Sequence, residues 1–188
     1  ALDAPGLVNL RLTDNLLDSI NIEKCPVLET LNLKGNKIFS FNTASATIKN
    51  LDLSRNALEK LRIAGFTALE SLDVSVNSLR YPVWIEWPVA PALNYLNVGF
   101  NNLLQLDLIT YRNLKTLICN NNSISELELN DVPDLEVLRA GYNGFKALDV
   151  AKCPGLKVLD IRGTSAGPIR LNALPSLEEL NMQLTGIS

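Results

Sequence analysis

The sequence predicts a mostly β solenoid, a fold in which short structural repeats stack in a row. Three observations lead to this prediction. Leucines recur in the same pattern about every 21 residues along the chain. Inside each repeat, apolar and polar residues alternate at the spacing of a short strand. An asparagine then follows at a fixed place, where its side-chain amide can bond backbone groups that a sharp bend would leave unpaired.

Nine repeats cover the chain when the first is taken to begin at Pro5. Their first residues are residues 5, 26, 46, 67, 91, 112, 133, 154 and 175, and these residues are counted as repeat position one. Position six is leucine in all nine repeats, from Leu10 to Leu180. Position eleven is asparagine in the first seven repeats and threonine in the last two: Asn15, Asn36, Asn56, Asn77, Asn101, Asn122, Asn143, Thr164 and Thr185. We expect the asparagines to form a buried ladder that bonds backbone groups of adjacent coils.

The repeat resembles a known family. Leu114, Leu117, Cys119 and Asn122 follow the spacing L-x-x-L-x-L-x-x-N, which is the leucine-rich-repeat signature. A further L-x-(L/I/V) in the second half, as in residues 61–63, is similar to the nested 21-residue class found in internalin J-like and Bacteroidetes surface proteins. The resemblance implies a right-handed horseshoe solenoid, of the α/β class by convention, with a parallel sheet on its concave face. It implies no particular ligand, because such proteins share a scaffold and not a binding partner.

Each repeat is expected to contribute one short strand to a continuous parallel sheet. In the repeat that begins at residue 112, the strand is predicted at positions six to eight, with Leu117 and Cys119 pointing inward and Thr116 and Ile118 outward. A repeat of 21 residues leaves little room for a helix on the outer side. We therefore predict one leucine-rich-repeat domain over residues 1–188 with little helix. Neither end shows a polar capping repeat, so we expect a fragment of a longer chain.

The fourth repeat departs from the pattern after Leu79. It is three residues longer than the usual repeat, and two prolines exclude a regular strand or helix interior. This stretch brings Tyr81, Trp84 and Trp87 together in one loop. The aromatic side chains either pack on the neighbouring coils or form a secondary binding site. The second half of the eighth repeat is irregular as well, because it contains two glycines and a proline.

The composition gives no sign of catalytic chemistry. Hydrophobic residues make up 47% of the chain but aromatic residues only 6%, as expected when leucine fills the interior. Histidine is absent from the sequence, and no common metal, nucleotide or hydrolase motif occurs. We therefore predict no enzyme, no cofactor and no metal. The net charge of −3 gives no reason to expect nucleic acid, and no apolar run reaches the length of a membrane span.

Aspartate or asparagine recurs at repeat position seven or seventeen. The residues are Asp52, Asp73, Asn97, Asp149 and Asp160. Such repetition indicates solvated positions of the pattern, because a carboxylate pair for hydrolysis would be placed only once.

The three cysteines are expected to fill the core without forming a disulfide. Cys25 and Cys153 occupy the same repeat position six coils apart, which places them about 29 Å from each other at the spacing of stacked strands. A disulfide requires Cα atoms within about 7 Å. Cys119 points inward from its predicted strand, so all three thiols are predicted to be buried and unbridged.

The candidate binding site lies on the outward face of the middle repeats. Positions five, seven, nine and ten point away from the core, and in the first three repeats they are almost all polar. In the next four repeats they include apolar or aromatic residues and one arginine: Val76, Tyr95, Phe100, Ile118, Val137, Arg139 and Tyr142. Apolar patches with aromatic residues and arginine are typical of protein interfaces. The other interpretation is that these side chains shield one another or are covered by flanking chain.

Two functions remain open from the sequence. The first is a non-enzymatic module that binds a protein, or alternatively a glycan, as part of a bacterial surface or secreted protein; the nested repeat favours it and an extracellular location. The second is a cytoplasmic scaffold or targeting segment attached to a catalytic domain such as a phosphatase; the free cysteines favour it. The uncapped terminal repeats would also permit end-to-end association.

Overall fold

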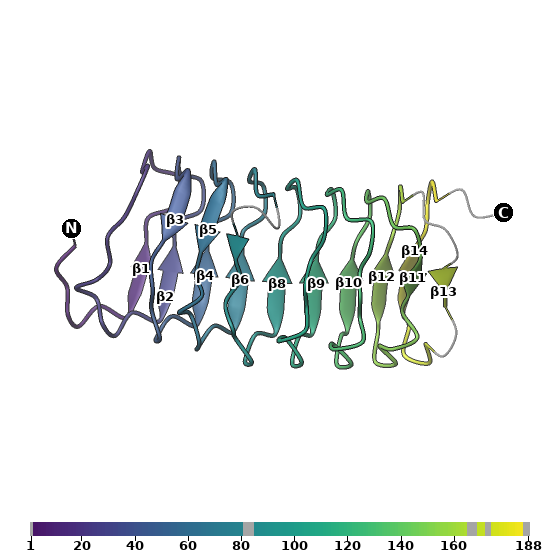
Figure 1. Ribbon diagram of the computed structural model, residues 1–188. Helices are drawn as coiled ribbons and strands as arrows, with labels where there is room; N and C mark the ends of the chain where they lie inside the picture. Colours follow the sequence, from purple (N-terminus) through teal and green to yellow (C-terminus); the bar gives the residue numbers. More distant parts are fainter. Residues whose placement is uncertain (1, 81–84, 165–168, 172–173, 186–188) are drawn as a thin grey trace.

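The chain winds into a solenoid whose coils follow one another in a single row (Figure 1). A computed structural model describes residues 2–80, 85–164, 169–171 and 174–185. Within these residues there are fourteen short strands and no helix, so the prediction of little helix is confirmed. None of them forms a helix that could cross a membrane.

One strand from each coil joins a nine-stranded parallel sheet, as predicted. Its strands, in spatial order, are β1 (Asn9–Arg11), β2 (Thr30–Asn32), β4 (Asn50–Asp52), β6 (Ser71–Asp73), β8 (Tyr95–Asn97), β9 (Thr116–Ile118), β10 (Val137–Arg139), β12 (Val158–Asp160) and β14 (Glu179–Asn181). The register aligns the leucines at position six, so that Leu117 lies opposite Leu96 on one side and Leu138 on the other. The core is therefore a row of leucines along the solenoid.

The strands begin and end one residue earlier than predicted. They occupy positions five to seven, as in Thr116–Ile118, instead of positions six to eight. The reason lies in the carbonyl group at position eight. The Cys119 carbonyl accepts hydrogen bonds from the side-chain amides of Asn122 and Asn143, at 3.1 and 3.0 Å, in place of a backbone N–H from the next strand.

Six asparagines at position eleven link each coil to the preceding one. Asn122 is representative: its Nδ2 donates to the carbonyl groups of Cys119 in its own coil and Val98 in the preceding coil, and its Oδ1 accepts from the Leu103 N–H. The same arrangement is made by Asn36, Asn56, Asn77, Asn101 and Asn143. These bonds satisfy backbone groups that the bend turns toward the interior.

The ladder does not extend to every residue at position eleven. Asn15 was predicted as a member, but it is exposed and bonds only carbonyl groups of its own coil. Its coil has no neighbour on that side among the described residues. Among the described residues, Thr164 and Thr185 also bond only their own coils, because a threonine hydroxyl is shorter than an asparagine amide and has no second donor.

The second halves of the coils form two smaller parallel sheets that the sequence did not predict. One contains β3 (Ser40–Asn42), β5 (Lys60–Arg62) and β7 (Ile85–Glu86), and the other contains β11 (Leu148–Asp149) and β13 (Ile169–Arg170). The fifth and sixth coils contribute no strand here. Their residues 105–107 and 126–128 alternate between exposed and buried side chains, as strands do, but share no backbone hydrogen bond.

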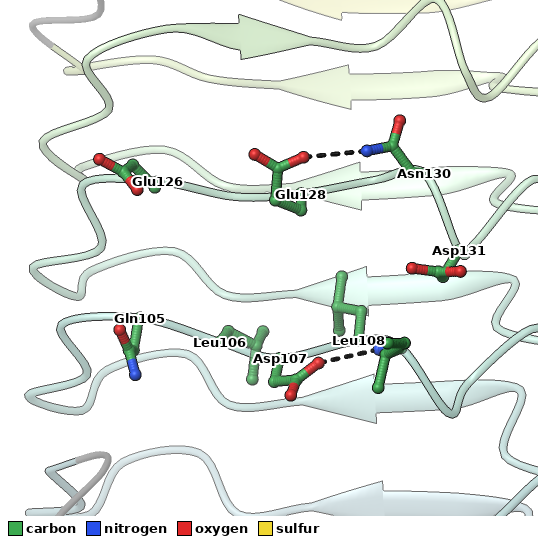
Figure 2. A pocket seen from close by; sticks show the side chains of 9 residues that line it. Gln105, Leu106, Asp107, Leu108, Glu126, Glu128, Asn130 and Asp131 are labelled. Atoms are coloured by element: carbon green, nitrogen blue, oxygen red, sulfur yellow. Dashed lines mark hydrogen bonds between the residues drawn. The ribbon is translucent and has the colours of Figure 1, made fainter.

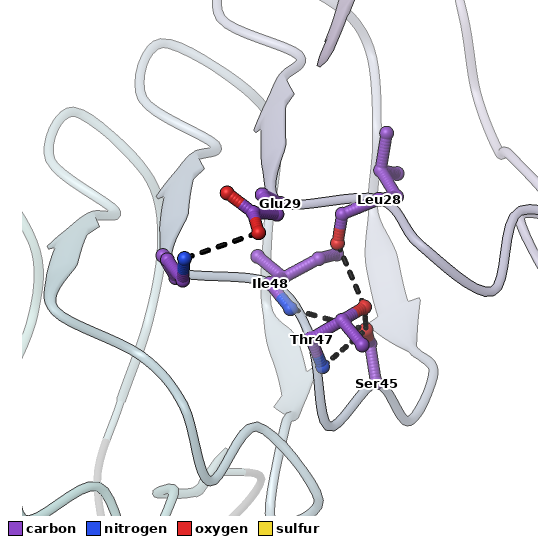
Figure 3. Close-up of polar contacts among 6 residues, drawn as sticks. Leu28, Glu29, Ser45, Thr47 and Ile48 are labelled. Atoms are coloured by element: carbon purple, nitrogen blue, oxygen red, sulfur yellow. Dashed lines mark hydrogen bonds and ion pairs between the residues drawn. The ribbon is translucent and has the colours of Figure 1, made fainter. Parts of the chain in front are cut away.

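Polar side chains also join the coils at the turn before β4. The Thr47 hydroxyl donates to the Leu28 carbonyl of the preceding coil at 2.8 Å, and the Ser45 hydroxyl accepts from the N–H groups of Thr47 and Ile48 (Figure 3). The turn is thereby fixed against the neighbouring coil.

All three cysteines are buried and unbridged, as predicted. Burial raises the pKa of the Cys119 thiol to about 12. Burial, followed by the nearby charge of Asp149, raises the pKa of Cys153 to about 11. Both thiols therefore stay protonated at neutral pH, in the form that is a poor nucleophile.

We expect the folded protein to react slowly with a thiol reagent such as DTNB at pH 8, and to release three equivalents once it is unfolded in guanidinium. The thiolate is the reactive species, and folding suppresses it at Cys119 and Cys153 by raising the pKa. The measurement is the absorbance time course with and without denaturant. Rapid reaction of all three thiols in the folded state would contradict the buried placement.

Candidate binding surface

The backbone is left-handed at position ten of every repeat. The φ angles there lie between 53° and 69°, and no other described residue has a positive φ. The nine residues are Asp14, Gly35, Arg55, Val76, Phe100, Asn121, Tyr142, Gly163 and Leu184. Glycine, asparagine and aspartate adopt this conformation readily, whereas a β-branched or bulky side chain rarely does. This requirement was not predicted from the sequence, although four of the nine residues are glycine, asparagine or aspartate.

Val76, Phe100 and Tyr142 therefore occupy an unfavourable backbone conformation. Their side chains are also exposed, at 46%, 54% and 45%. Burial in the core does not compensate for the conformational cost, which is roughly 1–2 kcal/mol for such residues. Backbone strain that packing does not explain is typical of functional sites.

Replacing Val76 by Asn should raise the free energy of unfolding by about 0.5–1 kcal/mol, because Asn tolerates a positive φ and Val does not. Urea denaturation would measure the change. Val89→Asn is the matched control, since Val89 is more exposed, at 60%, and lacks the positive φ. Equal effects of the two substitutions would show that the backbone at Val76 is not strained.

Position seven shapes the bend that leads to position ten. The side-chain oxygens of Asn32, Asp52, Asp73, Asn97, Asp160 and Asn181 each accept the backbone N–H two residues later. This is an Asx-turn, which mimics a backbone turn. The prediction that these positions are solvated is therefore wrong for Asp160, and at Asp52 and Asp73 it missed the structural role in the turn. Asp52 and Asp73 are half-buried and Asp160 is buried, because each is bonded into the turn of its own coil.

Two consecutive coils lack this turn-forming residue. Ile118 and Arg139 occupy position seven in the sixth and seventh coils, directly opposite each other in the sheet. Neither can accept the turn hydrogen bond. Arg139 lies 4.0 Å from Glu179, a distance at which exposed partners interact weakly. The sixth and seventh coils therefore have an outward apolar residue and an outward basic residue in place of the turn-forming Asp or Asn.

The predicted site residues lie on one surface, which we call the apolar face. Tyr95, Ile118, Val137 and Arg139 are half-buried on β8, β9 and β10, and Val76, Phe100 and Tyr142 project from the bends that follow β6, β8 and β10. Tyr95 and Val137 are not direct neighbours, because Thr116 lies between them. The Tyr142 ring covers Gly163, where an added Cβ would lie 2.4 Å from the ring.

A polar groove of about 350 Å³ adjoins the apolar face on its N-terminal side. Its lining includes Asn32, Asp52, Asp73 and Tyr95. Burial raises the pKa of Tyr95, and the charge of Asp73 raises it further. The Tyr95 phenol therefore remains neutral and available as a hydrogen-bond donor at physiological pH.

The predicted secondary site is described only in part. Tyr81 and Trp84 lie outside the described residues. Trp87 is half-buried and packs against the core, and its indole Nε1 has no hydrogen-bond partner among the described residues. With the exposed residues Val89 and Ile109 it lines a hollow of about 230 Å³.

A larger hollow of about 410 Å³ lies between the second halves of the fifth and sixth coils (Figure 2). Asp107, Glu126, Glu128 and Asp131 line it. Glu128 accepts a hydrogen bond from Asn130, and Asp107 accepts the Ile109 N–H. Across the described chain, no three carboxylate or thiol groups gather closely enough to hold a metal ion.

Comparison with solved structures identifies the fold. The functional domain of InlJ from Listeria monocytogenes is 21% identical, with a TM-score of 0.75 over 96% of this chain and 45% of that one. YopM from Yersinia enterocolitica is 29% identical, with a TM-score of 0.82 over 94% of this chain and 37% of that one. The chain is a leucine-rich-repeat solenoid.

Leucine-rich-repeat proteins with bound ligands also share this architecture. The plant peptide hormone receptor RGFR1 in complex with RGF2 is 24% identical, with a TM-score of 0.53 over 86% of this chain and 25% of that one. This leucine-rich-repeat chain spans less than half the length of each of these three proteins. No protein-family model and no curated protein matches the sequence.

Proposed function

We propose that this chain is a non-enzymatic protein-binding module, part of a bacterial surface or secreted protein, and that the apolar face contacts its partner. The observation that carries the proposal is that large, exposed side chains are held at positive φ in the fourth, fifth and seventh coils. Val76, Phe100 and Tyr142 stand where glycine or asparagine would cost less. A partner that buries these side chains on binding would offset that cost.

The chemistry of the apolar face supports a protein over a glycan. Tyr and Arg are enriched at the energetic centres of protein interfaces, and isoleucine and phenylalanine gain free energy when a partner excludes water. The InlJ and YopM structures place the same fold in bacterial proteins, and RGFR1 was solved with RGF2 bound. These likenesses support the class of function and not the identity of the partner.

Site-specific photo-crosslinking tests the location of the contact. A photoreactive amino acid at Asn121, between the coils of Phe100 and Tyr142, should crosslink to a protein purified on the wild-type chain. The same group at Lys152, an exposed turn residue outside the nine-stranded sheet, is the control and should not crosslink. Crosslinking from Lys152 alone would contradict the proposal.

A further inference from the structure

The outward side chains at position seven form a row with a graded chemical character. Across β4, β6, β8, β9 and β10, the register places Asp52, Asp73, Asn97, Ile118 and Arg139 side by side. This part of the row therefore runs from two acids through an amide and an apolar residue to a base, and it is flanked by Asn32 beside Asp52 and by Asp160 beside Arg139. Ile118 and Arg139 belong to the apolar face, and Asp52 and Asp73 line the polar groove.

The two carboxylates at the acidic end form no ion pair among the described residues, although the lining of the polar groove also includes Arg11 of β1. Each uses Oδ1 to accept a serine hydroxyl at 2.6 Å and the backbone N–H of the same serine at 2.9 Å. The Oδ2 of Asp73 accepts Nδ2 of Asn97 at 3.0 Å. The ion pairs found in the described chain include neither Asp52 nor Asp73.

The turn does not require these negative charges. Asn32, Asn97 and Asn181 make the same Asx-turn bond at the same repeat position with a neutral amide. Like charges that lie directly opposite in adjacent strands are destabilising. The pair at Asp52 and Asp73 therefore carries a cost that the turn geometry does not explain.

Tyr95 completes the surroundings of the carboxylate pair. It lies on β8, directly opposite Ser71 of β6, and lines the same groove as Asp52 and Asp73. An aromatic face beside two carboxylates suits a cationic side chain, because the cation is attracted by the ring as well as by the charges. Arginine suits this site best, since its planar guanidinium both stacks on rings and pairs with carboxylates.

We propose that the apolar face docks an extended segment of its protein partner, and that an arginine of this segment binds between Asp52 and Asp73 against Tyr95. The inference rests on the proposed function, and it names the chemistry of the partner. From the middle of the carboxylate pair to Ile118 is about two and a half strand spacings, roughly 12 Å. An extended chain covers this distance in about three to four residues. The partner's large apolar residue therefore lies that far from its arginine, and an acidic residue beyond it faces Arg139.

A random-peptide phage library, selected on the wild-type chain, on D52N/D73N and on F100N/Y142N, tests this inference. D52N/D73N keeps the Asx-turn acceptors and removes the like-charge repulsion, so it should fold with unchanged or higher stability. We expect peptides selected on the wild type to carry a basic residue three or four positions from a large apolar one. The best of them, made synthetically, should bind D52N/D73N at least about tenfold more weakly, with a smaller dependence on salt.

Replacing the peptide's arginine by citrulline separates charge from shape. The citrulline peptide should bind the wild type about tenfold more weakly than the arginine peptide does. On D52N/D73N the two peptides should bind with equal affinity, as a double-mutant cycle requires. The inference would be overturned if the selected peptides lack a basic residue and bind D52N/D73N as tightly as the wild type. If these peptides no longer bind F100N/Y142N, the proposed function still stands. Peptides that bind both variants normally, or no selection on the wild type, would contradict both.

Discussion

Replacing Asn122 by Ala should lower the free energy of unfolding by about 1–3 kcal/mol. The substitution leaves the N–H of Leu103 without its partner, and it removes one of the two amide donors from the carbonyl groups of Val98 and Cys119, which keep Asn101 and Asn143. A buried polar group that loses its only hydrogen bond costs about 1–3 kcal/mol. Urea denaturation, monitored by circular dichroism at constant m-value, measures the change.

Asn15→Ala is the matched control for Asn122→Ala. Asn15 occupies the same repeat position, but it is exposed and bonds only its own coil, so its loss should cost no more than a few tenths of a kcal/mol. Equal losses at the two positions would show that the asparagines act as turn formers and not as links between coils.

Replacing Leu117 by Ala should destabilise the chain by about 2–5 kcal/mol. Leu117 is fully buried at the centre of the leucine row, and deleting a buried leucine side chain leaves a cavity that neighbours fill only in part. Its neighbour Ile118 points outward on the same strand and is half-buried. Ile118→Ala should therefore cost under about 1 kcal/mol and instead weaken partner binding. A reversed order of the two stability losses would contradict the strand orientation.

The sequence was sufficient to predict the repeat, the nine-stranded sheet and its register. Position six is always leucine, and a leucine in register in every coil is compatible with only one stacking arrangement. The same regularity did not reveal the two smaller sheets. The segments around Leu61 and Leu127 share the L-x-(L/I/V) pattern, yet only the first forms a strand there. The difference lies in the backbone hydrogen bonds between neighbouring coils, which join β5 to β3 and β7 and are absent between residues 105–107 and 126–128, and the pattern of a single repeat does not encode them.

The residues of the candidate surface were predicted from the sequence, but the positive φ at position ten was not. Gly35 and Gly163 at position ten indicate a left-handed backbone there. Val76 and Phe100 do not, because valine and phenylalanine rarely adopt a positive φ. The role of Asp52 and Asp73 was missed for a related reason. The sequence alone indicates that a recurring aspartate is solvated. Its role in the turn becomes clear only from the structure, which shows the bend and the N–H group that the carboxylate accepts.

The affinity of a purified protein partner for F100N/Y142N tests the central claim most directly. Isothermal titration calorimetry would compare this variant with the wild type and with V89N/I109N, which removes two exposed apolar residues outside the apolar face. Two central aromatic residues should contribute at least about 2 kcal/mol each, so F100N/Y142N should bind several hundred-fold more weakly. It should unfold at the same urea concentration as the wild type or a higher one, because Asn suits the positive φ. Unchanged affinity for F100N/Y142N, with loss in V89N/I109N, would contradict the claim and place the site at the hollow beside Trp87.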